Sequence, residues 1–225
     1  MTTLNPDDKI LSYGDVVLRR SDLGILRSPS FINDRLIAFY FAHLSSSHSS
    51  AGGGEGRLLL VPPSISFWLS HCPNTPSRIE AATPLGLHDR DLVLFTVNNN
   101  DDVTLAEGGT HWSLLVYDRG NNIFVHHDSC NGMNHQHARR LYDAVKNFFG
   151  GDPRFMVGQT PQQRNGYDCG LYVMAAARVI CDWFENGKEG GENWFKKLDM
   201  EVGEEAVASL RLELLGLIAS LGGRV

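Results

Sequence analysis

The junction at residue 169, where a polar turn runs into an apolar segment, constrains this chain more than any other feature. The turn reads Gly-Tyr-Asp-Cys-Gly over residues 166–170, and the apolar segment extends from Leu171 to Phe184. A helix that is apolar nearly all round is buried at the centre of a fold. We therefore predict a central buried helix with Cys169 in its first turn.

A cysteine in the first turn of a helix is a candidate nucleophile. The unpaired N–H groups and the positive end of the helix dipole favour a thiolate over a thiol at that position. Free cysteine is also among the most buried residue types, so Cys169 alone is more typical of a structural thiol. The hypothesis of a cysteine enzyme therefore requires other residues that could activate Cys169, above all a base.

The length and net charge of the chain limit the number of domains and the kinds of partner that it can have. The 225 residues fit one domain with a full core, and the net charge is −6 with no run of basic residues longer than two. We predict no nucleic-acid or anionic-membrane partner, because both need a basic surface. Neutral or locally basic protein is the expected partner.

The N-terminus and the cysteines indicate the compartment. The first six residues lack the basic and apolar regions of a signal peptide, and no apolar run reaches the ~18 residues of a membrane span. The four cysteines are irregularly spaced and contain no C-x-x-C pair. We expect a soluble protein of a reducing compartment, the cytosol or the nucleus.

Hydrophobic periodicity and turn residues predict a mixed order of helices and strands, which is typical of an α+β fold. Helices are predicted over 30–44, 64–69, 135–149, 171–184 and 204–221, and strands over 57–61, 91–97, 111–117, 123–128 and 155–157. The Ser/Gly-rich segment 45–56 is predicted to be a flexible surface loop. A second loop is predicted over 98–110.

The hairpin of 111–117 and 123–128 pairs a histidine with an aspartate. If its turn is centred near Arg119-Gly120, cross-strand partners have residue numbers that sum to about 239. This register places His111 opposite Asp128, with Cβ atoms ~5 Å apart. Asp128 can then bind one imidazole nitrogen of His111 and leave the other free to face a thiol.

These residues meet the needs of a thiol protease. His111 is a candidate base for Cys169, Asp128 a candidate orienter, and the Gln163 amide a candidate oxyanion donor beside the Cys169 backbone N–H. Taken singly, each has an ordinary structural explanation, as do Asp168 and Asn134 as helix caps and Trp112 as a core residue. The hypothesis depends on their conjunction.

Several motifs resemble those of the ubiquitin-like-protein-specific cysteine proteases, the sentrin/Ulp family. They occur in the same order, His, Asp, Gln, Cys, and the similarity covers most of the chain. It is closest to the deneddylase branch, which acts on the Nedd/RUB-type modifier. The motifs are Gly109-Thr110-His111-Trp112-Ser113, Asp128-Ser129, Gln163 through Gly170, Leu11-Ser12-Tyr13, Arg20 through Leu23, and Asn33-Asp34.

The resemblance implies a papain-like α+β fold with a central, mainly antiparallel sheet against the cysteine helix. It implies one peptidase domain over 1–225, a monomer, no cofactor, and removal of the modifier from conjugates such as cullins. It also implies a narrow tunnel over the modifier's Gly-Gly tail, with Trp112 as one wall. Phe31 stands where the family usually has Trp, so it keeps an aromatic wall without an indole N–H.

Further expectations concern the surface around the site. We expect loop 98–110 to close over the modifier, with Gly108-Gly109 as a hinge. Asp34, Asp101 and Asp102 are candidates to pair with basic residues of the modifier, although each is equally well explained as a solvated carboxylate.

Other functions stay open. A SUMO-directed protease shares the catalytic residues, and a ubiquitin-directed protease is a more distant alternative. A non-catalytic module that binds a ubiquitin-like partner is a different class. A metal site is suggested by His126-His127-Asp128 with His135 and His137, although successive strand residues point to opposite faces.

Overall fold

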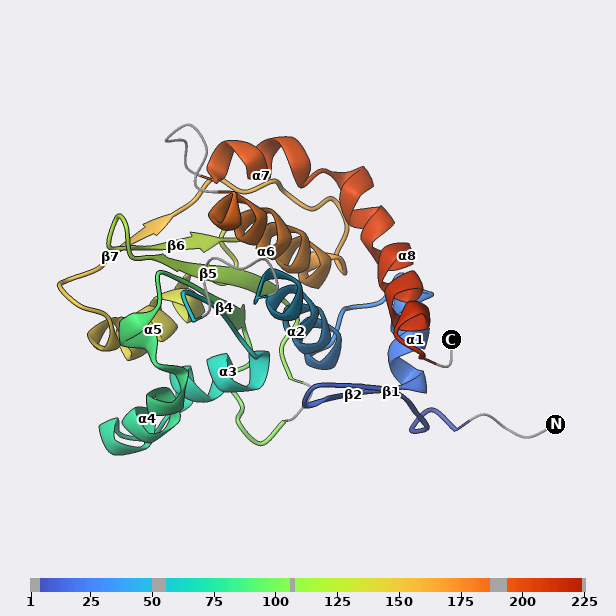
Figure 1. Ribbon diagram of the computed structural model, residues 1–225, viewed down its shortest axis with the longest axis horizontal. Coiled ribbons are helices and arrows are strands. Elements are labelled where there is room, and N and C mark those ends of the chain that lie inside the picture. The colour runs from blue at the N-terminus through green and yellow to red at the C-terminus, as the bar shows by residue number, and fades with distance from the viewer. Residues whose placement is uncertain (1–4, 50–55, 106–107, 187–193, 224–225) are drawn as a thin grey trace.

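The computed structural model describes residues 5–49, 56–105, 108–186 and 194–223, and its chain alternates helices and strands in the predicted α+β manner (Figure 1). The strands are β1 (Lys9–Tyr13), β2 (Val16–Arg19), β3 (Leu58–Val61), β4 (Leu92–Asn98), β5 (Trp112–Asp118), β6 (Ile123–His127) and β7 (Arg154–Val157). The helices are α1 (Arg20–Leu26), α2 (Asp34–Ser49), α3 (Pro63–His71), α4 (Thr75–Ala82), α5 (His135–Val145), α6 (Cys169–Glu185), α7 (Phe195–Glu201) and α8 (Glu204–Ser220). Short 3-10 turns cover Thr83–Leu85, Leu87–Asp89 and Lys146–Phe148.

The central sheet has five strands in the order β3-β4-β5-β6-β7. The inner pairs β4–β5 and β5–β6 are antiparallel, whereas the edge strands β3 and β7 run parallel to their neighbours. The predicted α+β class is confirmed, and the sheet is mixed rather than mainly antiparallel. The parallel edges arise because helical crossovers, not tight hairpins, connect β3 to β4 and β6 to β7.

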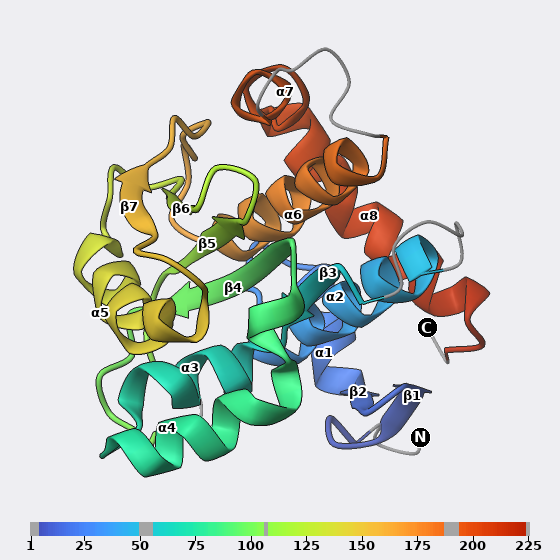
Figure 2. The ribbon, with the colours of Figure 1, turned by 60° about the vertical axis from the view of Figure 1, so that its left-hand side comes forward.

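Helices cover both faces of the sheet, and Figure 2 shows α3, α4 and α5 on the opposite side from α6 and α2. Side chains of β5 alternate between the two faces, as a strand with period two requires. Leu114 and Val116 join the core beneath α2, α6 and α8, whereas Leu115 and Tyr117 join the core beneath α3 and α5. The predicted central helix is confirmed, because α6 is buried along nearly its whole length.

Part of the fold was not predicted from the sequence. The β1–β2 hairpin packs beside α2, and α8 crosses both α6 and α1 (Figure 1). Strands β1 and β2 and helices α1, α4 and α7 have at most eight residues each, too short for a clear periodicity. No helix in the described ranges is long and apolar enough to cross a membrane.

Helix α2 begins and ends later than predicted. It extends to Ser49, so the predicted loop 45–56 is wrong over its first five residues, and residues 50–55 lie outside the described ranges. Ser47 Oγ donates to His43 O at 3.0 Å, and His48 lies 3.2 Å from Asp182 of α6. The contact between His48 and Asp182 ties the end of α2 to α6, and a tertiary contact of this kind cannot be read from the local composition.

The β5–β6 register differs from the prediction by two residues. Leu114 pairs with His127 rather than with Val125. The Asp118 carboxylate accepts a hydrogen bond from Gly120 N–H at 3.0 Å, which makes the loop four residues long instead of two. Because the shift is even, every side chain keeps its predicted face.

Close packing at the start of α6 predicts a stability effect at Gly170. A Cβ there would lie 2.6 Å from Ile32 Cβ, so we expect Gly170→Ala to lower the free energy of unfolding by about 1–3 kcal/mol. Gly216→Ala in α8 is the matched control, because no described atom lies within 4 Å of its Cβ position. We expect the control to raise stability by up to ~1 kcal/mol in urea titrations. Equal effects of the two changes would contradict this packing.

Candidate active site

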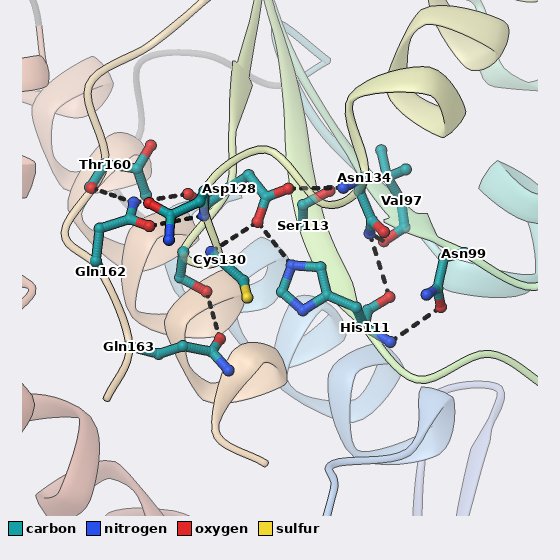
Figure 3. Close-up of polar contacts among 12 residues, drawn as sticks. Val97, Asn99, His111, Ser113, Asp128, Cys130, Asn134, Thr160, Gln162 and Gln163 are labelled. Carbon is teal, nitrogen blue, oxygen red and sulfur yellow. Dashed lines mark hydrogen bonds and ion pairs between the residues drawn. The ribbon is translucent and has the colours of Figure 1, made fainter. Parts of the chain in front are cut away.

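His111 and Asp128 meet at the ends of β5 and β6. His111 immediately precedes β5, Asp128 immediately follows β6, and His111 Nε2 lies 2.6 Å from Asp128 Oδ1 (Figure 3). Both side chains are buried, which strengthens the hydrogen bond by excluding water. The two residues come together as predicted although they are not direct cross-strand partners.

Backbone donors hold the Asp128 carboxylate in place. Its Oδ1 accepts from Cys130 N–H and its Oδ2 from Asn134 N–H, both at 2.8 Å (Figure 3). Burial raises the pKa of Asp128, but the hydrogen bonds from His111 and the two backbone N–H groups outweigh it and leave the pKa below its ordinary value. Asp128 is therefore a fixed carboxylate behind the imidazole.

Cys169, the first residue of α6, lies near enough to the His111 ring for its side chain to influence the pKa of His111. Burial opposes a charge on His111, but hydrogen bonds to Asp128 and Cys169, together with their charges, raise the pKa of His111 to about 9. The imidazole of His111 is therefore favoured in its protonated form at neutral pH. Cys169 itself is 0% exposed, so neighbouring groups cover it.

Two asparagines fix the backbone of His111. Asn134 Nδ2 donates to Val97 O at 3.1 Å and to His111 O at 3.2 Å, while Asn99 Oδ1 accepts from the N–H groups of Thr110 and His111 (Figure 3). Asn134 occupies the N-cap position of α5, but its side chain makes no capping bond to the described residues. The predicted cap is wrong because the buried carbonyls of two strands need the same donor.

Asp168 likewise occupies the N-cap position of α6 without capping it through its side chain in the described structure. Its Oδ2 accepts from Asn165 Nδ2 at 2.7 Å, and its Oδ1 from Arg211 of α8. The predicted cap is wrong here too, because the carboxylate binds these two side chains instead of the N–H groups of the helix. Arg211 gave no signal in the sequence, since it contacts Asp168 only through the tertiary fold.

Gln163 binds Ser129, the residue that follows Asp128 (Figure 3). Its Oε1 accepts from Ser129 Oγ and its Nε2 donates to Asn165 O, each at 2.8 Å. A primary amide has two N–H groups, so one stays available for an oxyanion beyond the partners described here. The amide is thus held in a fixed orientation.

The three residues predicted to contact substrate lie around the start of α2. Trp112 Nε1 donates to Ile32 O at 2.9 Å, which joins the start of β5 to the segment before α2. Phe31 is 51% exposed, so its ring is available to a ligand. Asp34 is the first residue of α2, and its Oδ1 accepts from Arg35 N–H.

His126 and His127, two of the histidines that suggested a metal site, bind different partners. His126 Nε2 lies 2.9 Å from Ser113 Oγ, whereas His127 Nε2 accepts a hydrogen bond from Trp194 Nε1 at 2.8 Å. Burial lowers the pKa of His126 to about 4 and that of His127 to about 3. Within the described ranges, no three His, Cys, Asp or Glu side chains gather as metal ligands.

The fold and this arrangement define a papain-type cysteine protease, and comparisons with known proteins give its family. Residues 79–204 match the model of the C-terminal catalytic domain of the Ulp1 protease family. The chain is 50% identical to NEDD8-specific protease 1 of Arabidopsis thaliana, over 98% of this chain and 97% of that protein. It is 35% identical to human sentrin-specific protease 8, over 79% of this chain and 84% of that protein.

A solved structure shares the fold. The C-terminal Ulp1 protease domain in complex with Smt3, the yeast ortholog of SUMO, superposes with a TM-score of 0.67 at 18% identity, covering 95% of this chain and 88% of that one. The chain belongs to the Ulp1 protease family. The predicted family is therefore confirmed.

The raised pKa of His111 predicts how stability depends on pH. Its pKa is about 9 in the folded state and ~6.5 in an unfolded chain, so its stabilising contribution is complete below pH ~6.5 and is lost as pH rises through about 9. We expect the difference in free energy of unfolding between the wild type and His111→Gln to shrink by up to ~3 kcal/mol as the pH rises from ~6.5 to above about 9. Urea unfolding of both proteins at several pH values measures it. A constant difference would contradict the raised pKa.

Proposed function

We propose that this protein is a thiol protease that cleaves after the C-terminal Gly-Gly of NEDD8 and releases it from target lysines. The observation that carries the proposal is the buried hydrogen bond of 2.6 Å between His111 and Asp128 beside Cys169, the first residue of a buried helix. The 50% identity to a NEDD8-specific protease over nearly the whole chain supports NEDD8 as the modifier. Processing of the NEDD8 precursor needs the same chemistry.

In the proposed reaction, the Cys169 thiolate attacks the carbonyl carbon of the terminal glycine. The resulting oxyanion accepts hydrogen bonds from the Cys169 backbone N–H and the Gln163 amide. The imidazolium of His111 then gives its proton to the lysine amine as the C–N bond breaks and a thioester forms. Water hydrolyses the thioester, with His111 taking the proton and Asp128 holding the ring throughout.

Substrate recognition is assigned to the residues around the start of α2. Trp112 and Phe31 are proposed to enclose the Gly-Gly tail, because glycines alone lack the side chains that a narrow aromatic passage would exclude. Asp34 is proposed to pair with a basic residue of NEDD8. We also propose that residues 1–225 act as a single monomeric peptidase domain in the cytosol or nucleus, without a cofactor.

Loop 98–110 is proposed to close over the bound modifier. In the described part of the loop, Asn98 Oδ1 accepts from Asn100 N–H and Asn100 Oδ1 accepts from Asp102 N–H, so side chains maintain its turns. Asp101 lies 2.8 Å from Arg140 and would have to exchange this partner to bind NEDD8. The full burial of Cys169 supports a movement on binding.

Labelling with modifiers that carry a C-terminal propargylamide tests the function. We expect the NEDD8 probe to label wild-type protein at Cys169, the SUMO and ubiquitin probes to react at least ~100-fold more slowly, and Cys169→Ala to remain unlabelled. Intact mass and peptide mapping give the result. Preferential reaction with the SUMO probe would replace NEDD8 by SUMO, and tight binding of NEDD8 without labelling would indicate a non-catalytic module.

Hydrogen exchange tests closure of loop 98–110. We expect amides of the loop to exchange more slowly when NEDD8 is bound to Cys169→Ala, because closure shields them from water. The hairpin loop 119–122, at the far end of β5 and β6, serves as the internal control and should not change. Unchanged exchange over 98–110 at saturating NEDD8 would contradict the closing role.

A further inference from the structure

Arg211 of α8 binds the residue that immediately precedes Cys169. Its Nε and Nη2 donate to Asp168 Oδ1 at 3.2 Å and 2.7 Å. Both side chains are largely buried, 13% and 12% exposed. The match to the Ulp1 family model ends at residue 204, so Arg211 lies beyond the part of the chain that the model describes.

All five N–H groups of the guanidinium have acceptors. Besides the two bonds to Asp168, Nη1 donates to Ile25 O at 2.9 Å and Ser28 O at 3.0 Å, and Nη2 donates to Ser30 O at 2.7 Å. The guanidinium carbon also lies 5.6 Å from the centre of the Tyr167 ring. The planar guanidinium thus holds Asp168 Oδ1 through two donors, while Asn165 Nδ2 holds Oδ2, so both oxygens of the carboxylate are fixed.

The hydrogen bonds from Arg211 to Asp168 restrain the backbone next to Cys169. The Asp168 carbonyl accepts from the N–H groups of Leu171 and Tyr172, so the residue is fixed to the first turn of α6 as well as to Arg211. The peptide between Asp168 and Cys169 carries the Cys169 N–H. Any rotation of Asp168 would therefore redirect this donor.

We propose that Arg211 is a positioning residue, which holds the Asp168–Cys169 peptide so that the Cys169 N–H points at the oxyanion. This inference rests on the proposed role of Cys169 as the nucleophile. Arg211 does not touch the substrate and acts only through Asp168. Its effect should therefore appear in the step that forms an oxyanion, and not in reactions of the thiol that form none.

The test compares amide cleavage with probe labelling in Arg211→Met and the milder Arg211→Lys. Cleavage of NEDD8 that carries a fluorogenic C-terminal amide measures kcat. Labelling by saturating NEDD8-propargylamide measures the rate at which the thiol adds to an alkyne, a reaction in which no oxyanion forms. We expect kcat to fall by about 10–100-fold in Arg211→Met and about 3–10-fold in Arg211→Lys, less than the ~10²–10³-fold for removing a donor outright. Labelling should stay within about twofold of wild type.

Glu213→Gln is the matched control, because it removes the 2.8 Å ion pair between Glu213 of α8 and Arg178 of α6 without touching Asp168. We expect its kcat to stay within about twofold of wild type. Arg211→Lys keeps a charge opposite Asp168, so it tests the inference even if Arg211→Met does not fold.

Three outcomes would overturn the inference. One is wild-type kcat in both Arg211 variants, another is labelling that falls in the same proportion as kcat, and the third is an equal loss in Glu213→Gln. If the probe panel selects another modifier, that modifier replaces NEDD8 in both assays. Failure of every modifier to label wild-type Cys169 would instead remove the proposed function, and this inference with it.

Discussion

The burial of α6 is the constraint on which the rest of the structure depends. Its apolar surface is covered by the sheet on one side and by α2 and α8 on others, and this packing fixes the direction of its N-terminus. Gly170 allows the segment before α2 to approach the first turn closely, at Ile32. The position of Cys169 is thus set by core packing, and the polar residues around it refine that position.

Hydrogen bonds then organise the site in two halves. One half, at the ends of β5 and β6, consists of His111 and Asp128 with the backbone donors and asparagines that hold them. The other half is the start of α6 with Asp168, which α8 braces through Arg211. The groups proposed to act in catalysis come from different elements, so the fold must bring both halves together to form the site.

The sequence predicted the elements with strong periodicity and the residues whose types are tied to a chemistry. It placed α6, α8 and the β5–β6 hairpin, and it paired His111 with Asp128 even though the hairpin loop was longer than assumed. The pairing survived because an even register shift preserves the face of a strand.

The two wrong predictions of helix caps have a common physical cause. Asn134 and Asp168 stand where helix caps are expected, and their residue types suit capping. Tertiary partners bind both side chains instead: Asn134 donates to the carbonyls of Val97 and His111, and Asp168 accepts from Arg211. Such competition involves residues distant in the sequence, so local patterns carry no information about it.

The complete burial of Cys169 has a consequence for the resting protein. A thiolate is the form of cysteine that oxidants attack most readily, and exposure governs which thiols are lost. Here the sulfur of Cys169 is covered by the groups packed around the start of α6. The same packing that positions the sulfur therefore also shields it from oxidants dissolved in the solvent.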